Sequence, residues 1–224
     1  MIPDALMLFA AGFGTRMKDL TKDRPKPMIE VAGQPLIDHA LRHAQRVVSG
    51  PIVANLHYLP EVLEAHLADT RVQTLREGPE ILETGGGLRN ALPLLGDGPV
   101  FTMNSDAVWA GANPLTMLRD HWRDDLEALL LCIDPARAVG HAGQGDFLPG
   151  PPVSRGPGLI YTGAQIIRTE GLQDIPDASF SLNVLWNQML DRGTLGILPY
   201  DGEWCDVGRP EGIAQAEAML ARHA

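Results

Sequence analysis

The basic residues of this chain gather beside a glycine-rich turn near its start. All three lysines, Lys18, Lys22 and Lys26, lie within nine residues of one another, in a chain whose formal net charge is -10. They follow the segment 10–17, which comes directly after an apolar run at residues 5–9. Glycines let backbone N–H groups approach an anion closely, and neighbouring cations neutralise its charge. The segment therefore predicts a loop that binds a polyphosphate.

The turn itself contains Gly12 and Gly14, followed by Arg16. It is not a Walker A loop, which requires Gly-x-x-x-x-Gly-Lys-Ser/Thr, and it is not the dinucleotide fingerprint, because Met17 stands where a third glycine would be. Taken alone, a Gly-x-Gly after a strand is as consistent with a plain tight turn as with a phosphate loop.

Two prolines, Pro25 and Pro27, flank Lys26 and restrict the backbone around it. A stiffened backbone could position this one ammonium group at a reaction site. The alternative is an ordinary solvated lysine in a proline-rich turn.

Two aspartates follow apolar runs at widely separated points of the chain. Asp106 comes shortly after the run 100–103, and Asp206 lies in the segment 204–208, just before the last amphipathic stretch. Two carboxylates together with phosphate oxygens and waters make a Mg²⁺ site. A lone aspartate after a strand is more often a helix cap or a turn residue, so the metal interpretation depends on the phosphate loop.

Three consecutive glycines follow Glu83 and Thr84. Glycines at the start of a helix would allow a flat base or a sugar to lie against the backbone. A flexible hinge or a helix cap explains the same residues equally well.

The histidines and cysteines show no arrangement typical of a metal site or a nucleophile. His39 and His43 lie one helical turn apart in a polar stretch with no evident third ligand, and we interpret them as surface residues. No Gly-x-Ser-x-Gly motif occurs, and neither Cys132 nor Cys205 has a basic partner nearby in the sequence. Nucleophilic hydrolase chemistry is therefore unsupported.

The elements that must position these residues alternate between strand and helix. Short apolar runs predict strands at residues 6–9, 52–56, 72–75, 100–103, 126–133, 159–167 and 195–198. Helical spacing predicts helices at residues 36–48, 60–67, 84–95 (capped by Thr84), 114–124, 183–192 and 209–222. Residues 134–158, rich in Gly, Pro and Ala, predict an irregular excursion. Repeated β–α units imply an α/β fold with a doubly wound, mostly parallel, Rossmann-like sheet, which binds ligands at the carboxyl ends of its strands.

Length and composition limit the class of protein. With 224 residues the chain can bury a full core, and we expect a single domain over residues 1–224. A pI near 5.1 argues against nucleic acid as a partner. The apolar runs are far shorter than the roughly 20 residues that cross a bilayer. The chain start lacks the basic region of a signal peptide and the two cysteines form no redox motif, so we expect a cytoplasmic protein without a membrane partner.

Taken together and in this order, the motifs resemble those of the sugar-phosphate nucleotidyltransferases. That family has a strand, then Ala-Ala-Gly-x-Gly-Thr-Arg-Met, then Pro-Lys-Pro, a later Gly-Asp after a strand, and Asp-Val/Ile-Gly near the end. The matching segments here are 10–17, 25–27, 105–106 and 206–208. The resemblance covers nearly the whole chain, and the motifs are specific as a set rather than singly.

Within that superfamily, segments 82–87, 91–95, 145–147 and 204–208 are most similar to the N-acetylmuramate-1-phosphate uridylyltransferases. Mannose-1-phosphate guanylyltransferases and glucose-1-phosphate thymidylyl- or uridylyltransferases carry nearly the same motifs. A nucleotide-sugar binding module that lacks catalysis is the non-enzyme alternative.

The resemblance implies transfer of a nucleoside monophosphate from an NTP, with UTP favoured, to a sugar-1-phosphate, with N-acetylmuramate-1-phosphate favoured and Mg²⁺ as cofactor. It implies that Arg16 and Lys26 are catalytic and that Asp106 and Asp206 hold the metal. The implied nucleotide-binding residues are Ala10, Ala11, Gly12, Gly14, Thr15, Arg16, Glu83, Thr84, Gly85 and Gly86. The implied sugar-binding residues are Asn104, Asp146 and Asn183.

The chain departs from the family pattern at two points. Ser105 replaces the usual glycine before the metal aspartate, and a residue this small should be tolerated. Many relatives carry a second, mid-chain lysine that contacts the sugar phosphate, but this chain has no lysine after Lys26. Arg155 could substitute, or the role could fall to Lys26 alone.

Overall fold

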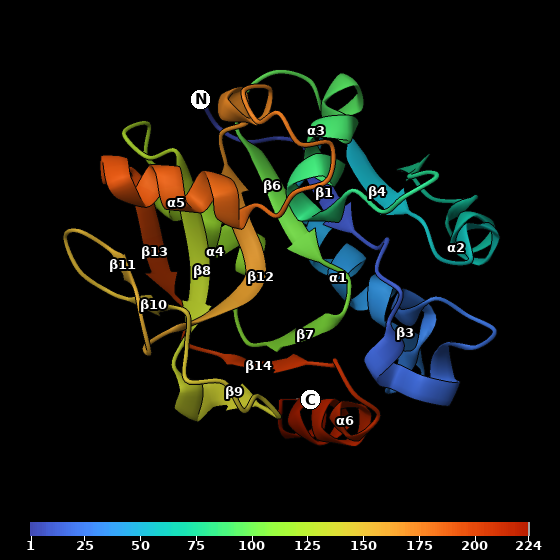
Figure 1. Cartoon of the computed structure of the whole chain (residues 1–224). Helices are drawn as coiled ribbons and strands as arrows, with labels where there is room; N and C mark the ends of the chain where they lie inside the picture. Colours follow the sequence, from blue (N-terminus) through green and yellow to red (C-terminus); the bar gives the residue numbers. More distant parts are fainter. Residues whose placement is uncertain (224) are drawn as a thin grey trace.

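The computed structural model describes residues 1–223, and at its centre is a seven-stranded sheet (Figure 1). In spatial order its strands are β13 (Leu195–Pro199), β8 (Ala128–Ile133), β12 (Ile160–Ile167), β6 (Val100–Asn104), β1 (Leu6–Phe9), β4 (Ile52–Leu56) and β5 (Val72–Arg76). β12 runs antiparallel to both of its neighbours. The remaining neighbours in the sheet are parallel. The predicted doubly wound, mostly parallel sheet is confirmed.

Helices cover both faces of this sheet, because a buried strand presents alternate side chains to opposite sides. On β1, Leu6 and Leu8 join one apolar cluster and Met7 joins the other. The first cluster includes residues of α1 (Leu36–Ala44), α2 (Pro60–Leu67) and α4 (Pro114–His121). The second includes residues of α3 (Glu83–Leu95) and α5 (Asn183–Arg192). No helix within residues 1–223 is long and apolar enough to cross a membrane.

β1 lies where the order of strands switches. The chain passes from β1 through α1 to β4 on one side, and later from β5 through α3 to β6 on the other side of β1. The ends of β1 and β6 meet, since Phe9 pairs with Asn104 and Ser105 Oγ donates a hydrogen bond to the Phe9 carbonyl oxygen (2.6 Å). A crevice at the carboxyl ends of the strands is expected at such a switch.

A second, smaller sheet was not predicted from the sequence. It consists of β7 (Ala107–Ala110), β14 (Glu203–Asp206) and β9 (Ala138–Val139), in the order β7-β14-β9. The last helix, α6 (Glu211–Arg222), packs against it in a third apolar cluster. These strands have two to four residues, too few for a period of two to be visible in the sequence.

The excursion 134–158 contains short elements rather than one loop. They are the turn η3 (Pro135–Arg137), strand β9 and a small hairpin of β10 (Phe147–Leu148) and β11 (Ser154–Arg155). The other short elements are η1 (Thr15–Thr21), η2 (Lys26–Met28), β2 (Glu30–Val31), β3 (Gln34–Pro35) and η4 (Glu170–Leu172). Helices α1 and α4 end three to four residues earlier than predicted, at Ala44 and His121.

The prediction that the histidines of α1 lie on the surface is wrong. His39 is buried, with Nε2 2.9 Å from the Val31 carbonyl oxygen, and the half-buried His43 ring lies 6.0 Å from the Trp109 ring. Burial lowers the pKa of His39, and burial together with nearby arginines lowers the pKa of His43 to about 4. Polar neighbours in the sequence concealed the fact that these two side chains face inward.

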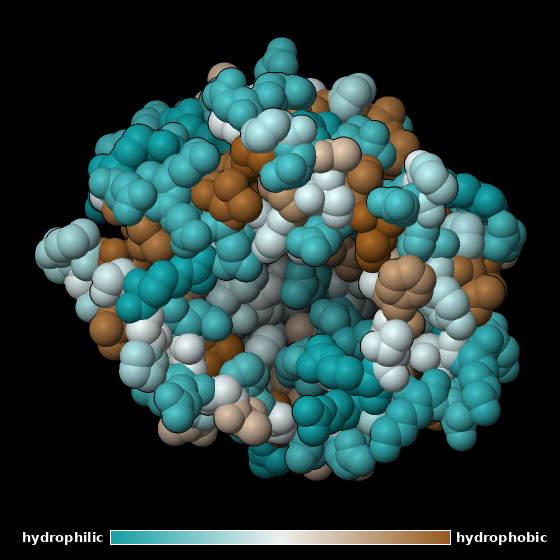
Figure 2. All heavy atoms as spheres, viewed as in Figure 1, coloured by the Kyte–Doolittle hydropathy of each residue, from teal (hydrophilic) through white to brown (hydrophobic). Residues whose placement is uncertain are grey.

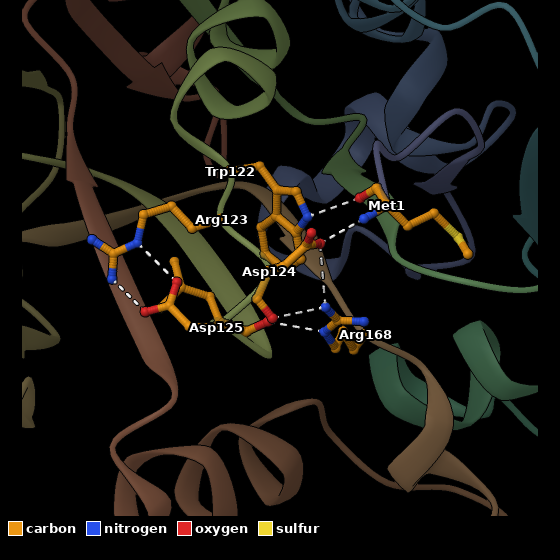
Figure 3. Close-up of polar contacts among 7 residues, drawn as sticks. Met1, Trp122, Arg123, Asp124, Asp125 and Arg168 are labelled. Carbon is orange, nitrogen blue, oxygen red and sulfur yellow. Dashed lines mark hydrogen bonds and ion pairs between the residues drawn. The ribbon is translucent and has the colours of Figure 1, made fainter.

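The start of the chain is tied to the loop before β8 (Figure 3). The Met1 ammonium lies 2.5 Å from Asp124 Oδ1, and Trp122 Nε1 donates to the Met1 carbonyl oxygen (3.1 Å). Arg168 in turn donates to the Asp124 carbonyl oxygen (3.0 Å). These contacts lie at the amino end of β1, whereas the cleft lies at the opposite, carboxyl end of that strand.

Candidate active site

The loop after β1 passes in close contact with Lys26. Gly14 has a φ of +64°, and a Cβ added there would lie 2.8 Å from Lys26 Cβ. Glycine is required at this position for both reasons. Gly12, by contrast, has no atom within 4 Å of its Cβ position and lines the cleft. The two glycines therefore differ in role. Gly14 allows the loop to pack against Lys26, and Gly12 leaves open space in the cleft.

A buried hydrogen-bond chain that the sequence analysis missed holds the start of this loop. The Ala10 N–H donates to Asn55 Oδ1 (2.9 Å), and Asn55 Nδ2 donates to Glu77 Oε1 (2.7 Å). The Leu82 N–H donates to the other Glu77 carboxylate oxygen (2.8 Å), just ahead of α3. Asn55 and Glu77 are 3% and 5% exposed. The available signal was an asparagine inside the apolar run 52–56.

The three clustered lysines do not act together. Lys26 begins η2, its side chain is 9% exposed, and its Nζ lies 2.6 Å from Asp106 Oδ2. Lys18 and Lys22 are exposed, and Lys22 pairs with a surface aspartate. The lysine flanked by prolines is therefore the one whose ammonium contacts Asp106.

The small sheet brings the two predicted metal aspartates together. Asp106 precedes β7 and Asp206 ends β14, where Asp206 pairs with Ala107 and the Val207 N–H donates to the Asp106 carbonyl oxygen (3.0 Å). Burial and the negative charge of Asp106 raise the pKa of Asp206, and the charge of Lys26 opposes that rise. Neighbouring carboxylates repel each other when both are ionised, so a cation bound beside them stabilises their charged forms.

The donor set suits a small, hard cation. Asp106 and Asp206 supply carboxylate oxygens, and no group of three or more His, Cys, Asp or Glu side chains suited to a metal occurs within residues 1–223. Mg²⁺ usually takes one or two carboxylates and completes its shell with waters and substrate phosphates. The residues therefore fit Mg²⁺, provided that the substrate contributes the remaining ligands.

Arg16, in η1, lies near Asp206. A Cβ on Gly208 would lie 3.0 Å from Asp206 Oδ2 and 3.1 Å from Arg16 Nη2, so Gly208 leaves room for both side chains. Arg16 and His141 line the cleft beside Asp206. Thr15 is exposed and lines none of the cleft's compartments described next.

These groups surround a hollow on the face where the parallel strands end (Figure 2). It has three compartments, and Asn104 lines all of them. The loop compartment is further lined by Phe9, Ala11, Gly12, Asn55, Glu83 and Thr84. The carboxylate compartment is lined by Arg16, Asp106, His141, Asp146, Tyr161 and Asp206. The outer compartment is lined by Thr84, Asp146, Phe147, Arg155, Asn183 and Trp186.

The glycines at the start of α3 contact protein. A Cβ on Gly85 would lie 2.3 Å from the Phe180 ring, and one on Gly86 would lie 2.4 Å from the Ala178 carbonyl oxygen. The N–H groups of Gly85 and Gly86 both donate to the Phe180 carbonyl oxygen (2.8 and 3.1 Å). Close packing on residues 178–180 therefore explains Gly85 and Gly86, and neither of them lines a compartment.

Thr84 does not cap α3 as predicted. The helix begins one residue earlier, at Glu83, whose φ is +56°. Thr84 Oγ1 instead accepts a hydrogen bond from the Leu182 N–H (3.0 Å), which links α3 to the segment before α5. Glu83 and Thr84 are the residues of this segment that line the loop compartment.

The three residues predicted to bind the sugar all line the outer compartment. Asn104 packs against Gly163, where a Cβ would lie 2.8 Å from its Cγ. Asp146 Oδ2 accepts a backbone N–H from β12 (2.9 Å). Asn183 Oδ1 accepts a hydrogen bond from Arg155 Nη2 (2.7 Å), so the arginine considered as a substitute for the missing lysine is also here.

Comparisons with known proteins agree with this architecture. The chain is 37% identical to the N-acetylmuramate alpha-1-phosphate uridylyltransferase of Caulobacter vibrioides, over 98% of each chain. It is 32% identical to the protein of the same name from Neisseria meningitidis serogroup B, over 95% of this chain and 96% of that one. The crystal structure of HddC from Yersinia pseudotuberculosis, 21% identical, shares the fold with a TM-score of 0.74 over 98% of this chain and 100% of that one. The sequence model of the MobA-like NTP transferase domain matches residues 6–175. The chain therefore belongs to the family of MobA-like NTP transferase domains.

Proposed function

We propose that this enzyme transfers a uridylyl group from UTP to N-acetylmuramate 1-phosphate, forming UDP-N-acetylmuramate and pyrophosphate. The observation that carries the proposal is the Lys26–Asp106 pair, 2.6 Å apart, with Asp106 lining both the loop and carboxylate compartments. The identity with uridylyltransferases along nearly the whole chain supports the choice of both substrates.

The reaction needs no side chain to remove a proton. A phosphate oxygen of the sugar phosphate attacks the α-phosphorus of UTP, and the bond from that phosphorus to the departing pyrophosphate breaks. Because a phosphate monoester has a second pKa of about 6, its attacking oxygen is already largely deprotonated at pH 7. Catalysis then consists of aligning two polyanions and neutralising their charge.

Each compartment binds a different part of the two substrates. The loop compartment takes the base and ribose, and the outer compartment takes the sugar, so the two phosphates meet beside Asn104. The Lys26 ammonium, nearly removed from water, stabilises the charge that builds on the α-phosphate oxygens. Arg16 holds the departing pyrophosphate from the carboxylate compartment. Asp106 and Asp206 would hold Mg²⁺, which supplies further charge neutralisation when bound.

A direct test is pyrophosphate release with Mg²⁺ over a grid of four nucleotides and four sugars. The grid pairs UTP, GTP, dTTP and CTP with the 1-phosphates of N-acetylmuramate, N-acetylglucosamine, glucose and mannose. One strong signal at UTP with N-acetylmuramate 1-phosphate is expected. A strong signal at another pair would refute the substrate assignment, and silence across the grid would refute the reaction.

The roles of the central pair can be tested by substitution. Lys26→Met and Asp106→Asn should each lower kcat at least about 100-fold, a loss of about 2.7 kcal/mol in transition-state stabilisation. Lys22→Met is the matched control, because it removes the same charge from an exposed side chain outside the three compartments. Near wild-type turnover in Lys26→Met would show that this lysine has been assigned wrongly.

A further inference from the structure

Arg155 is a cation held in a fixed orientation in the outer compartment. It lies on β11, and its guanidinium carbon sits 4.6 Å from the centre of the Phe147 ring and 5.6 Å from that of Trp186. Its Nη2 donates to Asn183 Oδ1 (2.7 Å) and to Asn187 Oδ1 (3.1 Å). Two aromatic rings and two amides thus keep the planar group in place before any ligand arrives.

All the hydrogen-bond partners of this guanidinium are neutral. Within residues 1–223 no carboxylate forms an ion pair with Arg155, and its Nη1 makes no hydrogen bond. The one carboxylate lining the same compartment, Asp146, already accepts a backbone N–H through Oδ2. The compartment is also bordered by Asn183, the first residue of α5, where the helix dipole favours negative charge. A fixed, unpaired guanidinium at such a place is a site for an anion, and the free Nη1 is available to bind it.

Arg155 borders a different compartment from the residues assigned to the reacting phosphates. The residues assigned to phosphate and metal, Arg16, Asp106 and Asp206, line the carboxylate compartment, which Arg155 does not border. A sugar 1-phosphate in the outer compartment whose phosphate points toward the carboxylate compartment would therefore present the other side of its ring to Arg155. N-acetylmuramate carries a carboxylate there, on the lactyl ether at C3, whereas N-acetylglucosamine has a plain hydroxyl.

We infer that Arg155 binds the lactyl carboxylate of the acceptor and so selects N-acetylmuramate 1-phosphate over N-acetylglucosamine 1-phosphate. This inference rests on the proposed function and assigns its specificity to one residue. Asp146, in the same compartment, is left to accept hydrogen bonds from the sugar's hydroxyl or amide groups.

The first experiment measures kcat/KM for both sugar phosphates with UTP in the wild type and in Arg155→Met. Methionine keeps most of the packing against Phe147 and Trp186 but removes the charge. The ratio of kcat/KM for N-acetylmuramate 1-phosphate over N-acetylglucosamine 1-phosphate should fall about 10- to 100-fold, the usual effect of losing a charge-assisted hydrogen bond. Arg155→Lys, which keeps the charge but loses the planar fork, should give an intermediate ratio. Arg46→Met removes an exposed charge outside the cleft and should keep the wild-type ratio.

A second measurement needs no variant and so does not depend on folding. The wild type is assayed with N-acetylmuramate 1-phosphate and with the same compound carrying a carboxamide in place of the lactyl carboxylate. A preference of about tenfold or more for the carboxylate is expected.

The outcomes separate this inference from the proposed function. Equal use of the carboxylate and carboxamide compounds, an unchanged ratio in Arg155→Met, or an equal loss for both sugars would overturn the inference alone. An equal loss would mean that Arg155 binds the phosphate common to both sugars. A wild-type enzyme that accepts N-acetylglucosamine 1-phosphate but not N-acetylmuramate 1-phosphate would refute the proposed function and this inference together.

Discussion

A methyl group added at Gly14 would test how closely the loop after β1 packs against Lys26. The new Cβ would lie 2.8 Å from Lys26 Cβ and 3.1 Å from Thr21 Cγ2. Carbon atoms in contact are normally about 3.5–4.0 Å apart, so the overlap with the lysine is about 0.7 Å or more. Lys26 Cβ is bonded to the backbone and cannot swing aside, so the lysine as a whole must move.

The expected cost has two parts. A residue with a Cβ pays about 1–2 kcal/mol to adopt the left-handed conformation of Gly14, whose φ is +64°. Overpacking adds about 1–3 kcal/mol. Gly14→Ala should therefore lower the free energy of unfolding by about 2–5 kcal/mol, and should lower kcat at least about tenfold because the Lys26 ammonium is displaced.

Urea denaturation measures the loss of stability, and steady-state kinetics measure the loss of kcat. Substitutions at two other glycines distinguish backbone strain from overpacking. Gly33 has a φ of +72° with no atom within 4 Å of its Cβ position, so Gly33→Ala carries the backbone strain without the overlap. Gly12 has neither feature, so Gly12→Ala should change the unfolding free energy by less than about 1 kcal/mol. If Gly14→Ala proved no less stable than Gly33→Ala, the close contact with Lys26 would not exist and the reasoning would fail.

Three further predictions concern the residues around the cleft. Asn55→Leu should destabilise the protein by about 2–4 kcal/mol in urea denaturation, because it removes the partner of one oxygen of the buried Glu77 carboxylate and of the Ala10 N–H. Gly85→Ala should lower the melting temperature without any nucleotide present, because its Cβ would overlap the Phe180 ring; an unchanged melting temperature would contradict this packing role. Stability should fall as pH drops from above 6.5 through about 4, by up to about 3 kcal/mol, because His43, whose pKa is about 4 when folded, takes up its proton more readily in the unfolded chain. His43→Gln should lack this part of the fall, and an identical pH profile in the variant would count against a neutral, half-buried His43.

Local sequence patterns were sufficient to predict most strands of the main sheet and most of the helices that cover it. The strand Leu6–Phe9, the strand Ile52–Leu56 and the helices Pro60–Leu67 and Asn183–Arg192 have the bounds that the sequence predicted. Apolar spacing and the placement of proline and glycine act over a few residues, so they can be recognised in the sequence itself. The difference between Lys26 and the other two lysines was likewise visible, because two prolines flank Lys26 alone.

For other residues the sequence did not reveal the surroundings of the side chain or backbone, which only the structure shows. The glycines after Glu83 were equally consistent with a contact to a base or sugar and with a flexible hinge or helix cap, whereas the structure shows Gly85 and Gly86 closely packed on residues 178–180. His39 and His43 were placed on the surface, although the helix turns them inward. Each of these properties depends on a neighbour far away in the sequence, which no local pattern specifies.

The sequence by itself determined which chemical groups this protein has and the order in which they occur: a glycine-rich loop, one lysine between two prolines and two aspartates after apolar runs. Only the tertiary structure decided which of them meet. The register of β14 on β7 brings Asp206 to Asp106. The end of β4 supplies Asn55 to Ala10, and the hairpin before β12 brings Arg155 to Asn183. The physical reason is that pairing between strands and packing across a sheet join distant segments, and their energies depend on the whole fold rather than on adjacent residues.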